Sequence, residues 1–274
     1  MAKSRPCALL AGMSIPRIVV LSLLVSVSAW AVAAWQQPGA RATTTMSMTL
    51  LPDLTPPKIA SRGQAVLARL TRRLTPDMTA NFDLFLYVSK SDRGPLAQRM
   101  YVFEKSGPED LKLAYEWTAS TGREKAEVNA RGRRVLTATP IGYYQIDPKR
   151  MYPRYRSASW DQDMPNSMFL DWERAGMQTG LAIHAAAASD VAKLGRRASG
   201  GCVHLSPEHA AALYDLIRTS YRGPVPRFAY DSQTRTRSNR GDFMHGRDGA
   251  LEMVDGYRVL IVLEDYGGED AAML

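Results

Sequence analysis

The 274-residue sequence contains only two cysteines, Cys7 and Cys202, and only four histidines. Because Cys7 lies in the extreme N-terminal segment, we expect one cysteine in the folded domain, which excludes an internal disulfide there. A zinc site on Cys202, His184 and His204 lacks a second cysteine and a well-spaced third histidine, so we expect no metal. The Gly-x-Ser-x-Gly elbow of serine hydrolases is also missing around Ser199, since residue 197 is arginine.

The composition is that of a globular protein with a basic surface. Hydrophobic residues make up 45% of the chain, which allows a substantial core and argues against general disorder. The net charge of +8 favours anionic partners such as nucleic acid, anionic lipid or an anionic cell-wall polymer. Charge alone does not distinguish among these partners, and it can also serve only to keep the protein soluble.

The first 36 residues have the pattern of an export segment. Lys3, Arg5 and Arg17 flank an apolar stretch over 18–35, and Ala31 and Ala33 offer a small-x-small cleavage site. Residues 1–36 are therefore expected to be a signal peptide or an N-terminal membrane anchor, and the protein to be exported to the periplasm or cell envelope. In an exported protein, we interpret the basic and aromatic residues of 150–160 as the solvated rim of a cleft and expect no nucleic-acid partner.

The rest of the chain predicts a linker and then a mainly β domain with one or two helices. Prolines and threonines over 37–58 indicate a linker. Ser61 is expected to cap a helix that ends before Pro76, and Ser206 a helix after Cys202. Alternating or apolar runs predict strands at 82–88, 99–104, 111–118, 143–146, 167–170, 181–184, 225–230 and 257–263. We expect one folded domain over 59–230, followed by an exposed polar loop at 231–249 and a C-terminal strand within 231–274.

Cys202 stands in a glycine-rich turn, and His184 ends a predicted strand. A cysteine attacks carbonyls as its thiolate and needs a base to form it, so His184 is the candidate base. The backbone N–H groups of Gly200 and Gly201 are candidates for an oxyanion hole. The alternatives are an inert buried Cys202 and a structural core histidine at position 184.

The segment from His184 to Cys202 resembles the signature of the L,D-transpeptidase catalytic domain, also called the YkuD domain. In that family a histidine, about fifteen residues and then Ser/Thr-His-Gly-Cys follow one another; here fourteen residues separate His184 from Ser199. Four further segments fall in the family's order over about residues 80–230. They are Ser120-Thr121-Gly122, Thr139-Pro140-Ile141-Gly142, Met164 to Phe169, and Leu194-Gly195.

The resemblance implies a β-sandwich or barrel-like domain and a cofactor-free peptidoglycan L,D-transpeptidase. Cys202 would attack the third residue of a stem tetrapeptide, with His184 as base and Ser199 and His204 as substrate contacts, and an amine would take the acyl group to give a 3→3 cross-link. An L,D-carboxypeptidase or amidase of the same fold, with water as acceptor, and a catalytically silent wall-binding module remain alternatives. Two departures bear on this: Gly200 replaces the family's histidine, and His204 replaces its arginine or asparagine.

Overall fold

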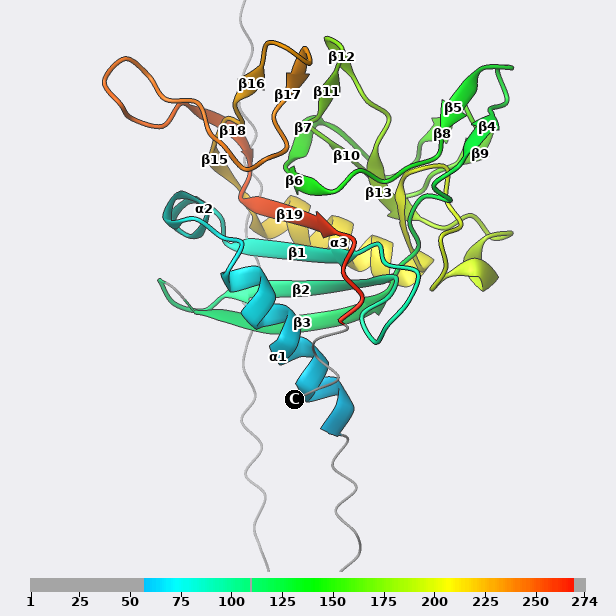
Figure 1. The fold of residues 1–274 in the computed structure, drawn as a ribbon, viewed down its shortest axis with the longest axis horizontal. Helices are drawn as coiled ribbons and strands as arrows, with labels where there is room; N and C mark the ends of the chain where they lie inside the picture. Colours follow the sequence, from blue (N-terminus) through cyan, green and yellow to red (C-terminus); the bar gives the residue numbers. More distant parts are fainter. Residues whose placement is uncertain (1–56, 109, 269–274) are drawn as a thin grey trace, which may run out of the picture. The chain divides into compact units, whose positions relative to one another are not determined.

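Two mixed β-sheets that share a hydrophobic core make up most of the fold (Figure 1). The computed structural model describes residues 57–108 and 110–268. The expected signal peptide or anchor at 1–36 lies outside the described residues, as does the linker up to residue 56. Within the described ranges, no helix has the length and apolar character that a bilayer crossing requires.

The first sheet has five strands in the order β3-β2-β1-β19-β6, with β1 and β19 parallel and the other pairs antiparallel. Their bounds are β1 Leu84–Ser89, β2 Arg99–Lys105, β3 Leu111–Thr118, β6 Gly142–Tyr144 and β19 Val259–Glu264. The predicted C-terminal strand is therefore an inner strand of this sheet, paired on both sides.

The second sheet has four strands in the order β14-β13-β10-β7, with β13 and β14 parallel. Its members are β7 Ile146–Tyr152, β10 Ser167–Leu170, β13 Ala182–Ala185 and β14 Val203–Leu205. Five two-stranded pairs complete the β structure. They are β4 Ala126–Val128 with β5 Arg134–Leu136, β8 Arg156–Ser157 with β9 Gln162–Asp163, β11 Glu173–Arg174 with β12 Met177–Gln178, β15 Arg222–Pro226 with β18 Met253–Tyr257, and β16 Tyr230–Asp231 with β17 Thr236–Arg237.

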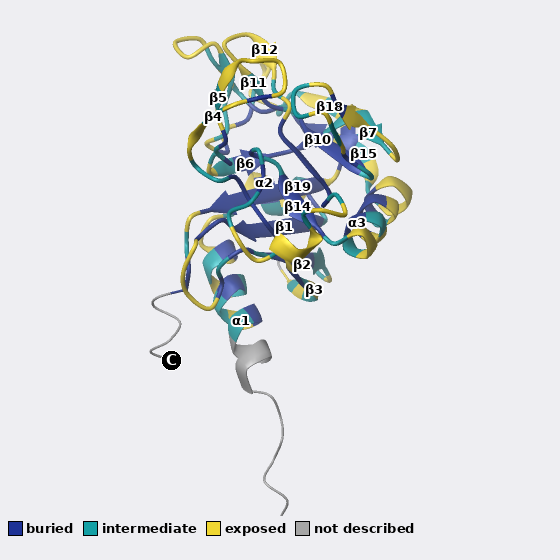
Figure 2. Cartoon of the chain, turned by 90° about the vertical axis from the view of Figure 1, so that its right-hand side faces the viewer, coloured by how far each residue is buried: buried dark blue, intermediate teal, exposed yellow. Residues whose placement is uncertain are grey.

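Strand β1 shows why the first sheet is buried on both faces. Side chains alternate along a strand, so Leu84, Leu86 and Val88 enter the core shared with the second sheet, whereas Phe85 and Tyr87 enter a second core on the opposite face. Each such apolar side chain stabilises the fold by about 1.5–3 kcal/mol. Figure 2 shows β1, β10, β14 and β19 buried, whereas the edge strands β3 and β7 are only partly buried and the β4–β5 and β11–β12 hairpins are largely exposed. The mainly β fold predicted from the sequence is confirmed.

The described part of the chain forms three α-helices that cover the sheets: α1 Pro57–Thr71, α2 Pro76–Asn81 and α3 Pro207–Ser220, with a short 3-10 turn at Val191–Lys193. Ser206 caps α3 as expected, accepting a hydrogen bond from the N–H of His209 at 3.2 Å. Ser61 is not a cap, because α1 begins four residues earlier. Helix α2 was not predicted; Thr75 caps it and Pro76 occupies its first turn.

The polar segment at 231–249, which was predicted as an exposed loop, packs against the rest of the domain. It contributes to the β16–β17 pair, and it buries Phe243, whose ring stacks on that of Phe228 with the centroids 5.1 Å apart. A single apolar residue among many polar ones carries little periodic signal, so the sequence pattern did not reveal this contact.

Candidate functional site

Strands β13 and β14 bring two imidazole rings side by side. The strands run parallel with His184 opposite His204, so both side chains project from the same face of the sheet. The ring centroids are 4.5 Å apart, and the residues are 2% and 4% exposed. The backbone of His204 also exchanges two hydrogen bonds with Ser120, at 2.8 and 3.0 Å. The imidazole pair is therefore fixed by backbone pairing on both sides of β14.

The turn that carries Cys202 is held together by Ser199. Its hydroxyl donates to the carbonyl oxygen of Cys202 at 2.5 Å and accepts the N–H of Gly201 at 3.0 Å. Gly201 has a φ of +128°, and a Cβ there would lie 3.0 Å from the carbonyl oxygen of Ala138. The turn therefore needs glycine at position 201 for both conformation and space.

A buried threonine ties this turn to the segments that precede it in the sequence. The hydroxyl of Thr139 donates to the carbonyl oxygen of Gly201 at 2.6 Å and accepts the N–H of Gly122 at 2.8 Å. A Cβ on Gly122 would lie 2.1 Å from the carbonyl oxygen of Thr137, so only glycine allows this approach. The Ser-Thr-Gly and Thr-Pro segments thus lie beside the Cys202 turn and support it.

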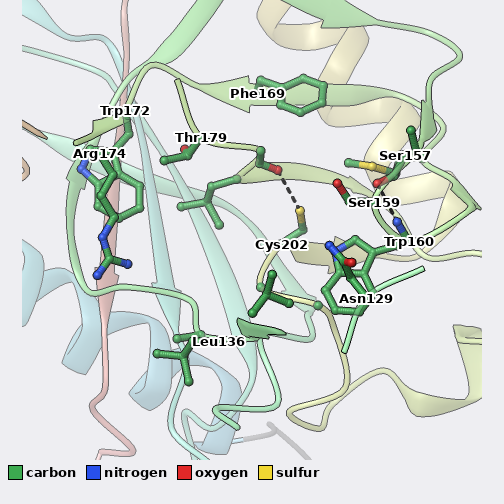
Figure 3. A pocket seen from close by; sticks show the side chains of 18 of the residues that line it. Asn129, Leu136, Ser157, Ser159, Trp160, Phe169, Trp172, Arg174, Thr179 and Cys202 are labelled. Carbon is green, nitrogen blue, oxygen red and sulfur yellow. Dashed lines mark hydrogen bonds between the residues drawn. The ribbon is translucent and has the colours of Figure 1, made fainter. Parts of the chain in front are cut away.

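Cys202 lines two pockets that meet at its side chain. The larger pocket has a volume of about 460 Å³, within the range of small-molecule sites, and Figure 3 shows Cys202 among its lining residues. The smaller pocket, of about 40 Å³, is lined by His184, His204 and Asp190 and has room for about one water molecule. Five residues line both pockets: Ser157, Trp160, Met164, Gly200 and Cys202.

The thiol of Cys202 is held in its neutral form. Burial raises its pKa to about 11, because the surroundings disfavour the thiolate, although backbone hydrogen bonding from Ala182 acts in the opposite direction. The sulfur lies 3.5 Å from the carbonyl oxygen of Gly180, drawn as the dashed line in Figure 3. A carbonyl oxygen accepts and cannot donate, so this contact also favours the protonated thiol.

Both imidazoles are neutral as well. Burial, and then the neighbouring His204, lower the pKa of His184 to about 3. Burial lowers that of His204 to about 4, against the opposing charge of Asp190. The Nδ1 atom of His184 lies 2.8 Å from the carbonyl oxygen of Ala185, so Nδ1 carries the proton and Nε2 keeps a lone pair. His184 is thus a neutral ring with an available basic nitrogen.

The predicted site residues divide between these two environments. Cys202, His184 and Gly200 lie around the small pocket, and Cys202, Gly200 and Gly201 border the large one. Neither Ser199 nor His204, the expected substrate contacts, lines the larger pocket. Among the described residues, the N–H of Gly201 is engaged by Ser199, whereas those of Gly200 and Cys202 have no hydrogen-bond partner.

Two residues that line the small pocket were not predicted, Arg123 and Asp190, and Trp160 was expected only as part of a cleft rim. The carboxylate of Asp190 accepts hydrogen bonds from Gln162 at 2.9 Å and Lys193 at 2.7 Å and lies in the small pocket. No spacing in the sequence links these residues, because they lie in three separate segments that are far apart along the chain. The expectation of a cleft rim near residues 150–160 was the nearest signal, and Trp160 does border both pockets.

Residues 57–108 and 110–268 contain no group of three or more His, Cys, Asp or Glu side chains that could hold a metal ion. Of the three residues weighed as a zinc site, His184 has its Nδ1 occupied by Ala185.

Comparison with known families places this geometry in context. The family model for the L,D-transpeptidase catalytic domain, YkuD, matches residues 86–251. A search of curated protein sequences found no match.

Several solved structures are similar to this one. An L,D-transpeptidase from Mycobacterium smegmatis is 14% identical with a TM-score of 0.38, and the alignment covers 67% of this chain and 59% of that protein. One from Xylanimonas cellulosilytica is 16% identical with a TM-score of 0.37, covering 72% and 68%. L,D-transpeptidase 1 of Mycobacterium tuberculosis is 15% identical with a TM-score of 0.31, covering 67% and 62%. The chain thus spans less than two thirds of two of these relatives.

Proposed function

The chain belongs to the L,D-transpeptidase catalytic domain family, and from that premise we propose that it is an exported peptidoglycan L,D-transpeptidase that works through an acyl-enzyme on Cys202. It acts on stem tetrapeptides and forms 3→3 cross-links or transfers the acyl group to another amine. The observation that carries the proposal is the position of one sulfur between two pockets: a large one of about 460 Å³ and a small one lined by the neutral imidazole of His184.

In the first half-reaction, Nε2 of His184 takes the proton of the Cys202 thiol. The thiolate attacks the carbonyl carbon of the third stem residue, and the tetrahedral intermediate places its negative charge on the former carbonyl oxygen. The unpaired N–H groups of Gly200 and Cys202 are the donors best able to stabilise that charge. Losing such a donor typically raises the barrier by about 2.7–4 kcal/mol. The protonated His184 then gives its proton to the departing D-alanine amine, leaving a thioester.

In the second half-reaction, an amine of another stem attacks the thioester and gives a proton to His184, and the thiol is restored as the new amide forms. No cofactor is needed, because the thiol itself supplies the covalent chemistry. The proton moves only between groups of the site and substrate, so the imidazole ends the cycle neutral, as it began.

The residues that line the larger pocket favour a peptide substrate of negative charge. Aromatic side chains of Phe169 and Trp172 line it, and Arg131 and Arg174 contribute cationic groups. Stem peptides carry carboxylates, which such groups attract over long range. The net charge of +8 acts in the same direction.

A second candidate function is a catalytically silent wall-binding module. The observation that favours it is the raised pKa of Cys202, which leaves very little thiolate at neutral pH. A third outcome, hydrolysis by a carboxypeptidase or amidase, shares the acyl-enzyme and differs only in the acceptor.

The decisive experiment is incubation of the purified protein with disaccharide-tetrapeptides, followed by mass spectrometry of the products. Cross-linked dimers support the transpeptidase, tripeptides alone support the hydrolase, and unchanged bound substrate supports the silent module. The Cys202→Ala and His184→Ala variants should lose product formation. His245→Ala is the matched control, since this imidazole lies outside both pockets and contacts the carbonyl of Phe243. Equal activity of the His184→Ala variant and the unmodified protein would refute the proposed role of the base.

A further inference from the structure

Trp160 lies against the one position where this chain has glycine and the family signature has histidine. An ideal Cβ on Gly200 would lie 2.7 Å from Cε2 and 2.9 Å from Nε1 of the indole ring. Real Cβ atoms essentially never approach other atoms so closely, so the indole occupies the space that any side chain at position 200 would need.

The indole is held there from several directions. It belongs to the turn of the β8–β9 hairpin, where Arg156 joins Asp161 and Asp163 at 2.8 Å each. The backbone N–H of Trp160 donates to the hydroxyl of Ser157 at 3.3 Å. This hairpin is also tied to the small pocket, because Gln162 on β9 is bound to Asp190.

A cation fixes the ring further. The guanidinium carbon of Arg123 lies 5.6 Å from the centroid of the indole, within the range of a cation–π contact. Arg123 is itself held by the carbonyl of Ala198 at 2.6 Å and the carboxylate of Glu127 at 2.8 Å. Trp160 is thus packed between Arg123 and the backbone at Gly200, and it borders both pockets at the point where they meet.

We propose that Trp160 is a positioning residue that closes the small imidazole pocket against the larger pocket, and that it can do so only because residue 200 is glycine. The indole separates the pocket of His184 and His204 from bulk water, which keeps both rings neutral and limits the access of water to the acyl-enzyme. Hydration would stabilise the charged form of His184 and raise its pKa. The charged or titratable groups around that ring are His204 from β14, Asp190 beside the 3-10 turn, Arg123 after the Ser-Thr-Gly segment, and Cys202.

The test is NMR titration of the His184 imidazole in five variants, one of which, Trp160→Phe, keeps an aromatic ring. In the unmodified protein the ring should stay neutral throughout the folded pH range, whereas in Trp160→Ala it should titrate with a pKa raised by about 1 unit or more. Gly200→Ala should have a similar effect, because its methyl group displaces the indole. The double variant should show no additional effect, since the two changes remove the same contact. Tyr115→Ala, an aromatic truncation outside both pockets, should leave the titration unchanged.

The part of the proposal that concerns the acyl-enzyme rests on the proposed function. The second measurement tests that part: it is the ratio of tripeptide to dimer products, which Trp160→Ala should raise several-fold. An unchanged His184 titration in Trp160→Ala, or additive effects of the two substitutions, would overturn the inference whatever the activity. Loss of activity in Trp160→Phe, which keeps an aromatic ring, together with an unshifted imidazole would overturn it as well. If Trp160→Ala does not fold, Gly200→Ala and Trp160→Phe still decide the question. Failure of His184→Ala to affect transfer would instead count against the proposed function alone.

Discussion

The hydroxyl of Thr139 links the Cys202 turn to the rest of the domain through two buried hydrogen bonds, so Thr139→Val tests what holds this turn. Valine has the same shape without the hydroxyl. The substitution leaves the carbonyl of Gly201 and the N–H of Gly122 without the partner that each has now. Thr139 is fully buried, so water does not compensate for the lost hydrogen bonds, and their loss costs free energy.

The expected magnitude follows from these two bonds. Each buried polar group left unpaired costs about 1–3 kcal/mol, so losing both bonds should cost the variant about 2–6 kcal/mol. For a domain of this size, 1 kcal/mol lowers Tm by about 2–4 °C, so Tm should fall by roughly 4–24 °C. Thermal unfolding followed by circular dichroism measures this. Acyl transfer should fall as well, because the turn that orients Cys202 is loosened.

Thr219→Val is the matched control, because this threonine donates to the carbonyl of Asp215 on the exposed side of α3. It should change the free energy of unfolding by less than about 0.5 kcal/mol. If Thr139→Val lowers Tm no more than Thr219→Val does, the Thr139 hydroxyl does not hold the Cys202 turn, and the reasoning is refuted.

Two further predictions concern the same turn and the imidazole pair. Gly201→Ala should destabilise the protein by about 1–3 kcal/mol, because the residue has a φ of +128° and a Cβ would press on Ala138; an unchanged urea midpoint would contradict this. The pKa values of His184 and His204 are lowered to about 3 and about 4 from 6.5. Below about pH 6.5, the unfolded chain therefore binds protons at these two residues that the folded protein does not bind. The contribution of these two histidines to the free energy of unfolding should therefore be fully present above about pH 6.5 and be lost as the pH falls toward 4. The His184→Ala/His204→Ala variant should show a flatter dependence of Tm on pH than the unmodified protein, and an equally steep dependence would show that other groups cause it.

Much of the fold followed from local pattern. The strands at 111–118 and 167–170 were predicted with the bounds that the structure has, because alternation and apolar runs are properties of consecutive residues. Ser206 and Pro207 predicted the start of α3 for the same reason. The start of α1 was predicted less accurately. The helix begins at Pro57, where the sequence has no capping side chain comparable to that of Ser61.

The sequence by itself determined the family signature, the pairing of Cys202 with His184 as candidates, and the need for glycine near the nucleophile. These depend on residue type and on spacing along the chain. Only the tertiary structure decided that Ser199 braces the turn, that His204 is buried beside His184, and that Trp160 covers Gly200. Each of those facts depends on strand register or on contact between distant hairpins, and the burial that sets the pKa values of the thiol and the imidazoles comes from the whole packed domain rather than from any local segment.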